Sequence, residues 1–393
     1  SFADPTPDNG EQYITSYTSI VAAYDSTEVT FRLGGTTDTY VVQKDGPQLT
    51  ITENDTAIKT MQKGDVWLIG AQGSYSDLSG SVVTSTKPVA VISGSFCGYI
   101  PRGIPACDFL IEQEMPVKTW GKKYHVSPIV KRKKASWVKV YASEINTQLY
   151  KDGEAWGTLT EVGGIENEGG FISRRLLDDD EAPRPVTISA DKPISITQYN
   201  PGYEDDLVFS DPFQMVLIPE KQYQTEMMYN TPGVSNSQAI FRENYINLIY
   251  LATEEGTIPD DLEWAQVVNG KYSWKKVANI LGGPGEKFSD PDRDESGRYY
   301  HSKTIRLPDP AGVYKFRAND PIAAYAYGFS DYDSYGYPAS SPFKDISKND
   351  TISPRVTYSI DCIGNVTGDV TDEPELDDEN KSNIRTIYLA QEQ

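Results

Sequence analysis

The stretch CDFLIEQEMPVKTWGKKYHV (107–126) holds the residues whose types and spacing best suit a catalytic site. Asp108 could act as a base and His125 as its partner, with Trp120 between them in the chain. However, the same Asp-to-Pro spacing recurs at 211–219, where no histidine follows. A repeated frame without its histidine favours an architectural role: Trp120 fills a gap between sheets, and His125 is a hydrogen-bonded structural residue.

The cysteines suggest a second kind of chemistry. Cys97 and Cys107 bracket the loop GYIPRGIPA. A loop of this length can bring two Cα atoms to disulfide distance, so a bridge in an oxidising compartment is the preferred interpretation. A nucleophilic cysteine would need a base such as His125, and the bridge would remove both candidates. Cys362 is then left over, either buried and inert or paired outside this segment.

Metal chemistry has one candidate pattern. His125 and His301 are the only histidines, so no histidine-rich zinc site can be assembled. Asp290, Asp292 and Asp294 alternate in DPDRDESG like the first ligands of a calcium loop. Because the glycine comes at position eight and His301 at position twelve, this is not an EF-hand. The alternatives are a looser calcium site between β modules and a solvated acidic turn.

Recognition residues concentrate in YAYGFSDYDSYGYP (325–338). Tyrosine rings are rigid and amphipathic, and with carboxylates between them they suit sugar stacking or a protein hot spot. The alternative is a tyrosine-rich strand followed by a long turn. The predicted ligand-binding residues are Tyr325, Tyr327, Phe329, Tyr332, Tyr335 and Tyr337.

The charge of the chain restricts its partners. A formal net charge of −21 repels phosphate backbones and anionic lipid, which argues against a nucleic-acid partner. KRKK (131–134) is either a solvated hairpin tip or a docking patch for an acidic neighbour, and acidic runs such as YEDDL (203–207) are predicted to be solvated loops. No apolar run approaches the roughly 20 residues of a spanning helix, so we expect no direct membrane insertion.

Common catalytic motifs are absent from the sequence. HExxH, GxSxG, the Walker loop and GxGxxG do not occur, which weakens the common hydrolase and nucleotide-binding classes. Paired-carboxylate glycosidase chemistry stays open, because 57 acids allow too many pairs. The sequence nevertheless favours a protein that is not an enzyme.

The elements that carry these residues are predicted to be strands. TKPVAVISGS (86–95), DKPISITQYN (191–200) and NDPIAAYAYG (319–328) each read polar, proline, then apolar at nearly every position, as in a strand buried on both faces. We place the proline at the first strand residue, where no ladder donor is needed. Turns such as YKDGEAWG (150–157) predict hairpins. The best helix candidate is DDLEWAQVV (260–268), and it is short.

The proline signature recurs at intervals of about 100 to 130 residues, too long for a solenoid repeat and suited to whole β-sandwich modules. The predicted fold class is therefore all-β, with three related β-sandwich-like repeats in tandem. We place the units at 1–115, 116–218 and 219–345. An acidic loop and a returning strand at 346–393 would lead into a further domain, because the last residues read as a strand without a closing turn.

The stretch KPVAVISGSFC followed by CDFLIEQEMPVKTWGKKYHVSP resembles the signature of the IgG Fc-binding protein N-terminal domain family. The resemblance is specific over 86–128 and only pattern-like over roughly 10–330. It implies a secreted, non-enzymatic extracellular module, and with only three cysteines the chain is more similar to a bacterial surface member than to the mucin-like animal members. The matching residues are Lys87, Pro88, Val89, Val91, Cys97, Cys107, Asp108, Glu112, Gln113, Pro116, Val117, Trp120, Gly121 and Tyr124.

These observations favour a secreted or cell-surface adhesion module that binds an extracellular protein or a glycan. One alternative is a structural subunit that self-associates into a surface layer, filament or secreted assembly. Another is an accessory region of a larger secreted enzyme. No cofactor is required, and calcium is the one candidate.

Overall fold

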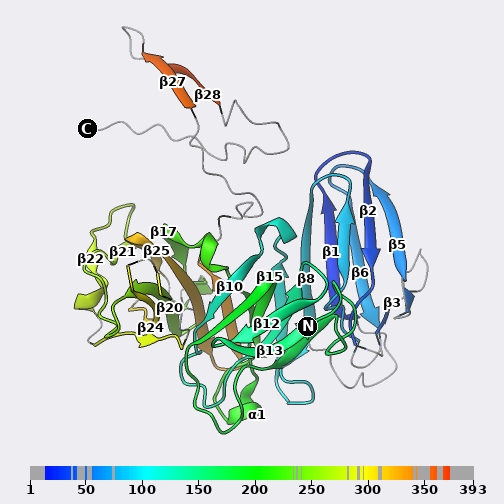
Figure 1. The fold of residues 1–393 in the computed structure, drawn as a ribbon, viewed down its shortest axis with the longest axis horizontal. Coiled ribbons are helices and arrows are strands. Elements are labelled where there is room, and N and C mark those ends of the chain that lie inside the picture. Colours follow the sequence, from blue (N-terminus) through cyan, green and yellow to red (C-terminus); the bar gives the residue numbers. More distant parts are fainter. Residues whose placement is uncertain are drawn as a thin grey trace.

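The structure, a computed structural model, consists almost wholly of antiparallel strands (Figure 1), so the all-β prediction is confirmed. Three groups of strands follow one another along the chain, and we refer to β1–β9, β10–β16 and β17–β26 as the first, second and third units. The structure describes residues 14–36, 39–41, 49–50, 55–72, 76–232, 234–235, 238–239, 241–280, 283–289, 293–294, 296–308, 312–339, 342, 355–360 and 366–371.

The first unit is a sandwich of unequal sheets. Its strands are β1 (Ile14–Ala22), β2 (Thr27–Arg32), β3 (Tyr40–Val41), β4 (Leu49–Thr50), β5 (Thr56–Met61), β6 (Val66–Gln72), β7 (Val82–Ser85), β8 (Val89–Tyr99) and β9 (Cys107–Gln113). A six-stranded sheet, ordered β4-β3-β6-β1-β8-β9, packs on a three-stranded sheet, β5-β2-β7, through a core that includes Ile20, Phe31 and Ile69. Val89 and Val91 of β8 pack against this core.

The second unit is built on its longest strand, β15. Its elements are η1 (Val117–Thr119), β10 (Gly121–Val126), β11 (Trp137–Ala142), β12 (Thr147–Lys151), β13 (Glu154–Leu159), β14 (Phe171–Arg175), β15 (Val186–Asn200), α1 (Tyr203–Asp206), β16 (Phe213–Val216) and η2 (Glu220–Gln222). The strand order is β13-β12-β15-β11-β14, and β10 and β16 also pair with β15. The hairpin predicted at 150–157 joins β12 to β13 through Asp152 and Gly153, both at positive φ.

The third unit is built in the same way on strand β25. Its elements are β17 (Gln224–Asn230), β18 (Val234–Ser235), β19 (Gln238–Ala239), β20 (Glu243–Ala252), β21 (Glu263–Val267), β22 (Lys275–Lys276), η3 (Val277–Asn279), β23 (Glu286–Lys287), β24 (Tyr299–Arg306), β25 (Val313–Ser330) and β26 (Asp333–Pro338). Beyond it, β27 (Arg355–Ile360) and β28 (Val366–Thr371) form a hairpin. The rest of the predicted acidic loop and returning strand, with Cys362, lies outside the described residues.

The two long strands correct the predicted position of proline. Pro88 does precede the first residue of β8, but Pro193 and Pro321 lie inside β15 and β25. The first half of β15 pairs with β10 and β12, and its second half with β11 and β16. Neither ladder includes Pro193, so the missing N–H removes no ladder bond where the strand passes from one set of partners to the other.

The helix predicted at 260–268 is wrong. Residues 263–267 form β21, which pairs with β25 and places Trp264 and Ala265 in the core of the third unit. The local helical preference is weak, and cross-strand packing outweighs it.

The charged runs KRKK and YEDDL neutralise each other instead of both facing solvent. Arg132 is buried, and its guanidinium lies 2.7 Å from the Asp206 carboxylate. Asp205, also buried, pairs with Arg175 at 2.6 Å. The predicted solvated loop at 203–207 is therefore a short helix, α1, which these ion pairs hold against the second unit.

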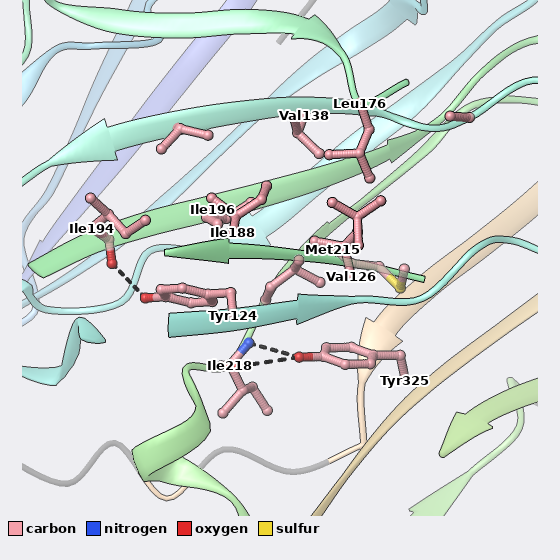
Figure 2. Close-up of a cluster of buried hydrophobic side chains, with 14 of the residues drawn as sticks. Tyr124, Val126, Val138, Leu176, Ile188, Ile194, Ile196, Met215, Ile218 and Tyr325 are labelled. Atoms are coloured by element: carbon pink, nitrogen blue, oxygen red, sulfur yellow. Dashed lines mark hydrogen bonds between the residues drawn. The ribbon is translucent and has the colours of Figure 1, made fainter. Parts of the chain in front are cut away.

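One continuous apolar core joins the second and third units (Figure 2). Val126, Val138, Ile188, Ile196 and Met215 of the second unit share it with Tyr245, Ile249, Phe288, Ala323, Tyr325, Tyr327 and Phe329 of the third. The Tyr325 hydroxyl accepts a hydrogen bond from the Ile218 amide at 2.9 Å. Because this junction buries large aromatic side chains, we expect it to be rigid.

Candidate binding site between the first two units

The predicted disulfide is present. Cys97 and Cys107 are bonded, with their Cα atoms 5.1 Å apart, and join the end of β8 to the start of β9. The bridge fixes the loop between two neighbouring strands. It also occupies both candidate nucleophiles.

Asp108 lies where all three units meet. Its carboxylate accepts a hydrogen bond from the Phe109 amide, and it lies near Asp211 of the second unit and Asp333 of the third. Burial, followed by repulsion from Asp333 and Asp211, raises the pKa of the Asp108 carboxyl to about 6. Burial and Asp333 also raise the pKa of Asp211. The two Asp-to-Pro stretches, 108–116 and 211–219, therefore place the carboxyl groups of Asp108 and Asp211 close enough to repel each other.

Lowering the pH from 7.5 to 5.0 is expected to increase the free energy of unfolding. The folded pKa of Asp108, about 6, lies above its unfolded value of about 3.9, so the ionised form destabilises the fold above pH 6. Protonation of Asp108 removes this destabilisation as the pH falls. The free energy of unfolding should therefore rise by about 1 kcal/mol after allowance for solvent screening. Urea unfolding of Asp108→Asn should show higher stability at pH 7.5 and a shallower pH dependence. Asp331→Asn, at an exposed ion pair, is the control, and identical slopes for all three proteins would contradict the assignment.

His125 and Trp120 have structural contacts. His125 is buried between the rings of Phe288 and Tyr300, and its Nδ1 lies 3.2 Å from Thr187 Oγ1. The Trp120 indole donates to the Met115 carbonyl at 2.9 Å. His125 lies in the core that joins the second and third units, whereas Asp108 lies at the start of β9. The structure thus gives no catalytic contact between Asp108 and His125.

The candidate calcium loop is described only in part. Asp290 and Asp292 lie outside the described residues. Asp294 accepts hydrogen bonds from the Arg298 side chain and amide, at 2.9 Å and 2.6 Å. Within the described part of the chain, no three His, Cys, Asp or Glu side chains gather to hold a metal ion. A calcium site in this loop stays a prediction.

The predicted tyrosine-rich face is divided between core and surface. Tyr325, Tyr327 and Phe329 alternate on the face of β25 that packs against the second unit, and all three are buried. Tyr335 and Tyr337 are partly buried, with their hydroxyls bonded to Asn244 and Asn230. Tyr332 alone is well exposed. The proposed face is therefore wrong as a continuous ligand surface, because the period of two along β25 turns its aromatic side chains into the junction.

A cavity of about 520 Å³ lies between the first two units. Its lining includes residues of β8 and β9 in the first unit and of β11, β15 and β16 in the second. We call it the junction cavity. Unlike the apolar junction of the second and third units, its walls carry many polar side chains, among them Ser93, Glu112, Glu114, Tyr141, Thr197 and Gln214.

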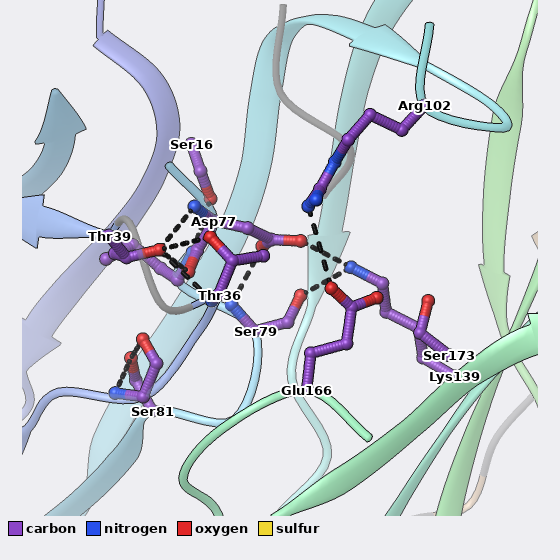
Figure 3. Close-up of polar contacts among 12 residues, drawn as sticks. Ser16, Thr36, Thr39, Asp77, Ser79, Ser81, Arg102, Lys139, Glu166 and Ser173 are labelled. Carbon is purple, nitrogen blue, oxygen red and sulfur yellow. Dashed lines mark hydrogen bonds and ion pairs between the residues drawn. The ribbon is translucent and has the colours of Figure 1, made fainter. Parts of the chain in front are cut away.

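A buried ion pair fixes the two units beside this cavity (Figure 3). Lys139 Nζ of the second unit lies 2.6 Å from Asp77 Oδ2 and 2.8 Å from Ser79 Oγ of the first, and neither charged side chain reaches solvent. Burial raises the pKa of the Asp77 carboxyl, but the Lys139 ammonium and the Ser79 amide outweigh it, so this pKa lies well below its usual value. Arg102 and Glu166 add a second ion pair, at 3.6 Å.

Backbone contacts between glycines bring the units close together. The Gly164 amide donates to the Gly80 carbonyl at 2.8 Å, and the Gly35 amide to the Gly164 carbonyl at 2.9 Å. Gly163 has a φ of +66°, and a Cβ there would lie 2.3 Å from the Gly80 carbonyl oxygen. Only glycine allows this approach, which sets the spacing of the cavity walls.

Two glutamates line the first-unit wall of the junction cavity. Glu112 pairs in register with Ser93, and Glu114 accepts a hydrogen bond from the Ser93 hydroxyl. Burial, followed by repulsion from Glu114, raises the pKa of Glu112 well above its usual value. Burial also raises the pKa of Glu114, although its side chain is accessible from the cavity. Among the described residues, neither glutamate forms an ion pair.

The second unit supplies the opposite wall. Thr197 and Gln214 are only 8% and 7% exposed, and within the described part of the chain neither side chain has a hydrogen-bond partner. The Tyr141 and Tyr199 hydroxyls stay neutral, because burial raises the pKa of both well above the usual value. The cavity thus combines two carboxyl groups with unused neutral hydrogen-bonding groups.

Sequence reasoning missed this site, although Glu112 lies in the family-like stretch. The available signal was the alternation of Leu110, Glu112 and Glu114, which places two acids on the same strand face as a buried leucine. That Thr197 and Gln214 lie opposite depends on how the units pack, which no local pattern encodes.

Comparison with known proteins shows which family the chain is similar to. The sequence profile of the family described as IgGFc binding protein matches residues 2–328. The human IgGFc-binding protein is 25% identical over 207 residues, which cover 52% of this chain and 4% of the human protein. No solved structure matches the chain. The expected bacterial source gains no support, since this relative is human.

The family match extends over most of the chain: it includes the first two units and the third unit as far as residue 328, near the end of β25. It therefore covers both walls of the junction cavity, the disulfide and the Asp77–Lys139 pair. The chain belongs to the IgGFc binding protein family.

Proposed function

We propose that this chain is a non-enzymatic, extracellular binding module and that its ligand binds in the junction cavity. The observation that carries the proposal is the pair of glutamates in the cavity, which have no cationic partner among the described residues. Carboxyl groups without a cationic partner destabilise the unbound protein, and binding sites commonly have unsatisfied polar groups of this kind. The disulfide supports a location outside the reducing cytosol. Within the described residues, no helix is long and apolar enough to cross a membrane.

The first partner to test is the Fc fragment of IgG, because the human relative is named for binding it. Immobilised Fc, Fab and a panel of extracellular proteins and glycans would be probed with the wild-type chain. Thr197→Phe, which places a ring in the cavity, is expected to reduce the affinity for the true ligand at least tenfold. Thr84→Phe, on an exposed position outside the cavity, is the control. A ligand that binds all three proteins equally would contradict the assignment of the site.

A structural subunit is the second candidate, and one surface favours it. Large apolar side chains on β6, β8 and β9 lie on the outer face of the six-stranded sheet, and each is about half exposed. They are Val66, Leu68, Phe96, Phe109 and Ile111. Exposed apolar patches of this kind mark association surfaces, and the occupant proposed here is a second copy of the chain.

Light scattering during size-exclusion chromatography tests this candidate across protein concentration. Growth of the particle mass with concentration, removed by Leu68→Lys, would support self-association. Repeating the measurement with calcium and with a chelator tests the predicted calcium loop. A monomer of constant mass would exclude the structural-subunit candidate.

A further inference from the structure

We propose that the junction cavity binds an organic cation, a primary ammonium or guanidinium group on an apolar stem, between Glu112 and Glu114. This inference rests on the proposed function, because it names the class of ligand for the same cavity. A lysine or arginine side chain of a protein partner and a free polyamine both have this chemistry.

The two carboxylates are held on one wall by strand geometry. Glu112 lies opposite Ser93 in the β8–β9 ladder, and the Glu114 amide donates to the Val91 carbonyl at 2.9 Å. Alternate residues of a strand face the same side, so both glutamates face the cavity. Burial raises the pKa of both carboxyls, and repulsion from Glu114 raises the pKa of Glu112 further. A cation between them would lower the free energy of both.

No cationic side chain that the structure describes forms an ion pair with these carboxylates. Lys139 is occupied by Asp77 and Ser79. Among the described lining residues, Lys118 is the only one with a cationic side chain, and neither glutamate forms an ion pair with it or with any other described residue. Among the described residues, this wall of the cavity therefore has two carboxyl groups without an ion-pair partner, whereas Asp77 and Lys139 beside it pair with each other.

The remaining walls suit the rest of such a ligand. The unused Thr197 and Gln214 side chains can accept hydrogen bonds from the N–H groups of an ammonium or guanidinium. Val89, Val91 and Val216 provide apolar surface for a methylene stem. A neutral sugar could bond to the same polar groups, but it would leave the repulsion between the glutamates in place. The carboxylate pair therefore favours a cation.

The test uses small probes on the whole chain. Nα-acetyl-arginine amide and Nα-acetyl-lysine amide represent a protein side chain, spermidine represents a polyamine, and lactose is the neutral control. Binding is measured by saturation-transfer NMR and calorimetry at pH 7.5 and 5.0. We expect at least one cationic probe to bind at pH 7.5 and to bind at least fivefold more weakly at pH 5.0, because protons then compete for the glutamates.

The matched variant is Glu112→Gln/Glu114→Gln. It keeps the shape of both side chains and removes their repulsion, so we expect it to fold at least as stably as the wild type at pH 7.5. It should lose at least tenfold in affinity for the cationic probe. Unchanged affinity in this variant, binding of lactose instead of every cation, or binding of no probe at all would overturn the ligand class.

The two proposals can fail separately. If the cationic probes fail while Thr197→Phe still abolishes binding of an extracellular partner, the cavity is the site and only the ligand class is wrong. If the partner binds Thr197→Phe normally while cationic probes bind as expected, the cavity binds cations but is not the partner site.

Discussion

Replacing Lys139 with methionine is expected to lower the free energy of unfolding by about 3 to 5 kcal/mol, because it leaves the Asp77 carboxylate buried without its cation. The Lys139 ammonium lies 2.6 Å from that carboxylate, and the side chains are 0% and 1% exposed. The ammonium also lies over the rings of Phe171 and Tyr199, each at 5.7 Å. All of these contacts lie at the junction of the first two units.

The pH dependence of this loss follows from the sign of the Asp77 shift. In the wild type, the pKa of Asp77 is below its usual value, so the contribution of the pair is present at neutral pH and is lost only in strong acid. In Lys139→Met, burial remains without the cation, and the pKa of Asp77 should move above its usual value. The variant should therefore approach the wild type in stability as the pH falls from 7 towards 4.

The double variant Asp77→Asn/Lys139→Met is the internal control. It carries no charge at positions 77 and 139, and the amide oxygen introduced at position 77 can still accept from the Ser79 amide, so at least half of the lost stability should return. Lys287→Met removes an exposed ion pair with Glu254 and should leave the free energy of unfolding nearly unchanged. Urea unfolding of the wild type and the three variants measures these free energies of unfolding. A loss below about 1 kcal/mol in Lys139→Met would show that the pair is not buried in solution.

Short-range patterns predicted much of the fold. The Asp-Gly pair at 152–153 predicted a tight hairpin, because both positions need positive φ, and the structure has it. Two cysteines on either side of a short loop predicted the disulfide. The apolar run after Pro321 predicted burial on both faces, and both faces of β25 are indeed buried there.

The failures have a common physical cause, which is packing between distant parts of the chain. Trp264 lies in a strand because β25, about 50 residues later, provides the ladder. Arg132 is buried because Asp206 of the later helix α1 pairs with it. The junction cavity was missed for the same reason, since its walls come from different units. Whether the units at 1–115, 116–218 and 219–345 are copies that fold independently stays a prediction.

Truncating Tyr327 to alanine is the second substitution with a large expected effect, about 3 to 5 kcal/mol of unfolding free energy. The side chain is fully buried, its hydroxyl donates to Asn247 Oδ1 at 3.0 Å, and it accepts from the Val130 amide at 3.2 Å. Its ring stacks with those of Phe213 and Tyr245. The substitution would therefore open a cavity between the second and third units and leave polar groups unpaired.

Tyr332→Ala is the matched control from the same tyrosine-rich stretch. Its side chain is 76% exposed, so the stability should change by less than about 0.5 kcal/mol. If Tyr327→Ala is too unstable to purify, Tyr327→Phe removes only the hydroxyl and should cost about 1 to 3 kcal/mol, because the Val130 amide loses its hydrogen-bond acceptor. Denaturant unfolding and binding assays together distinguish a structural role of this tyrosine-rich stretch from a ligand-binding role. Wild-type stability of Tyr327→Ala combined with lost ligand binding would contradict the buried junction and make the tyrosine a ligand residue.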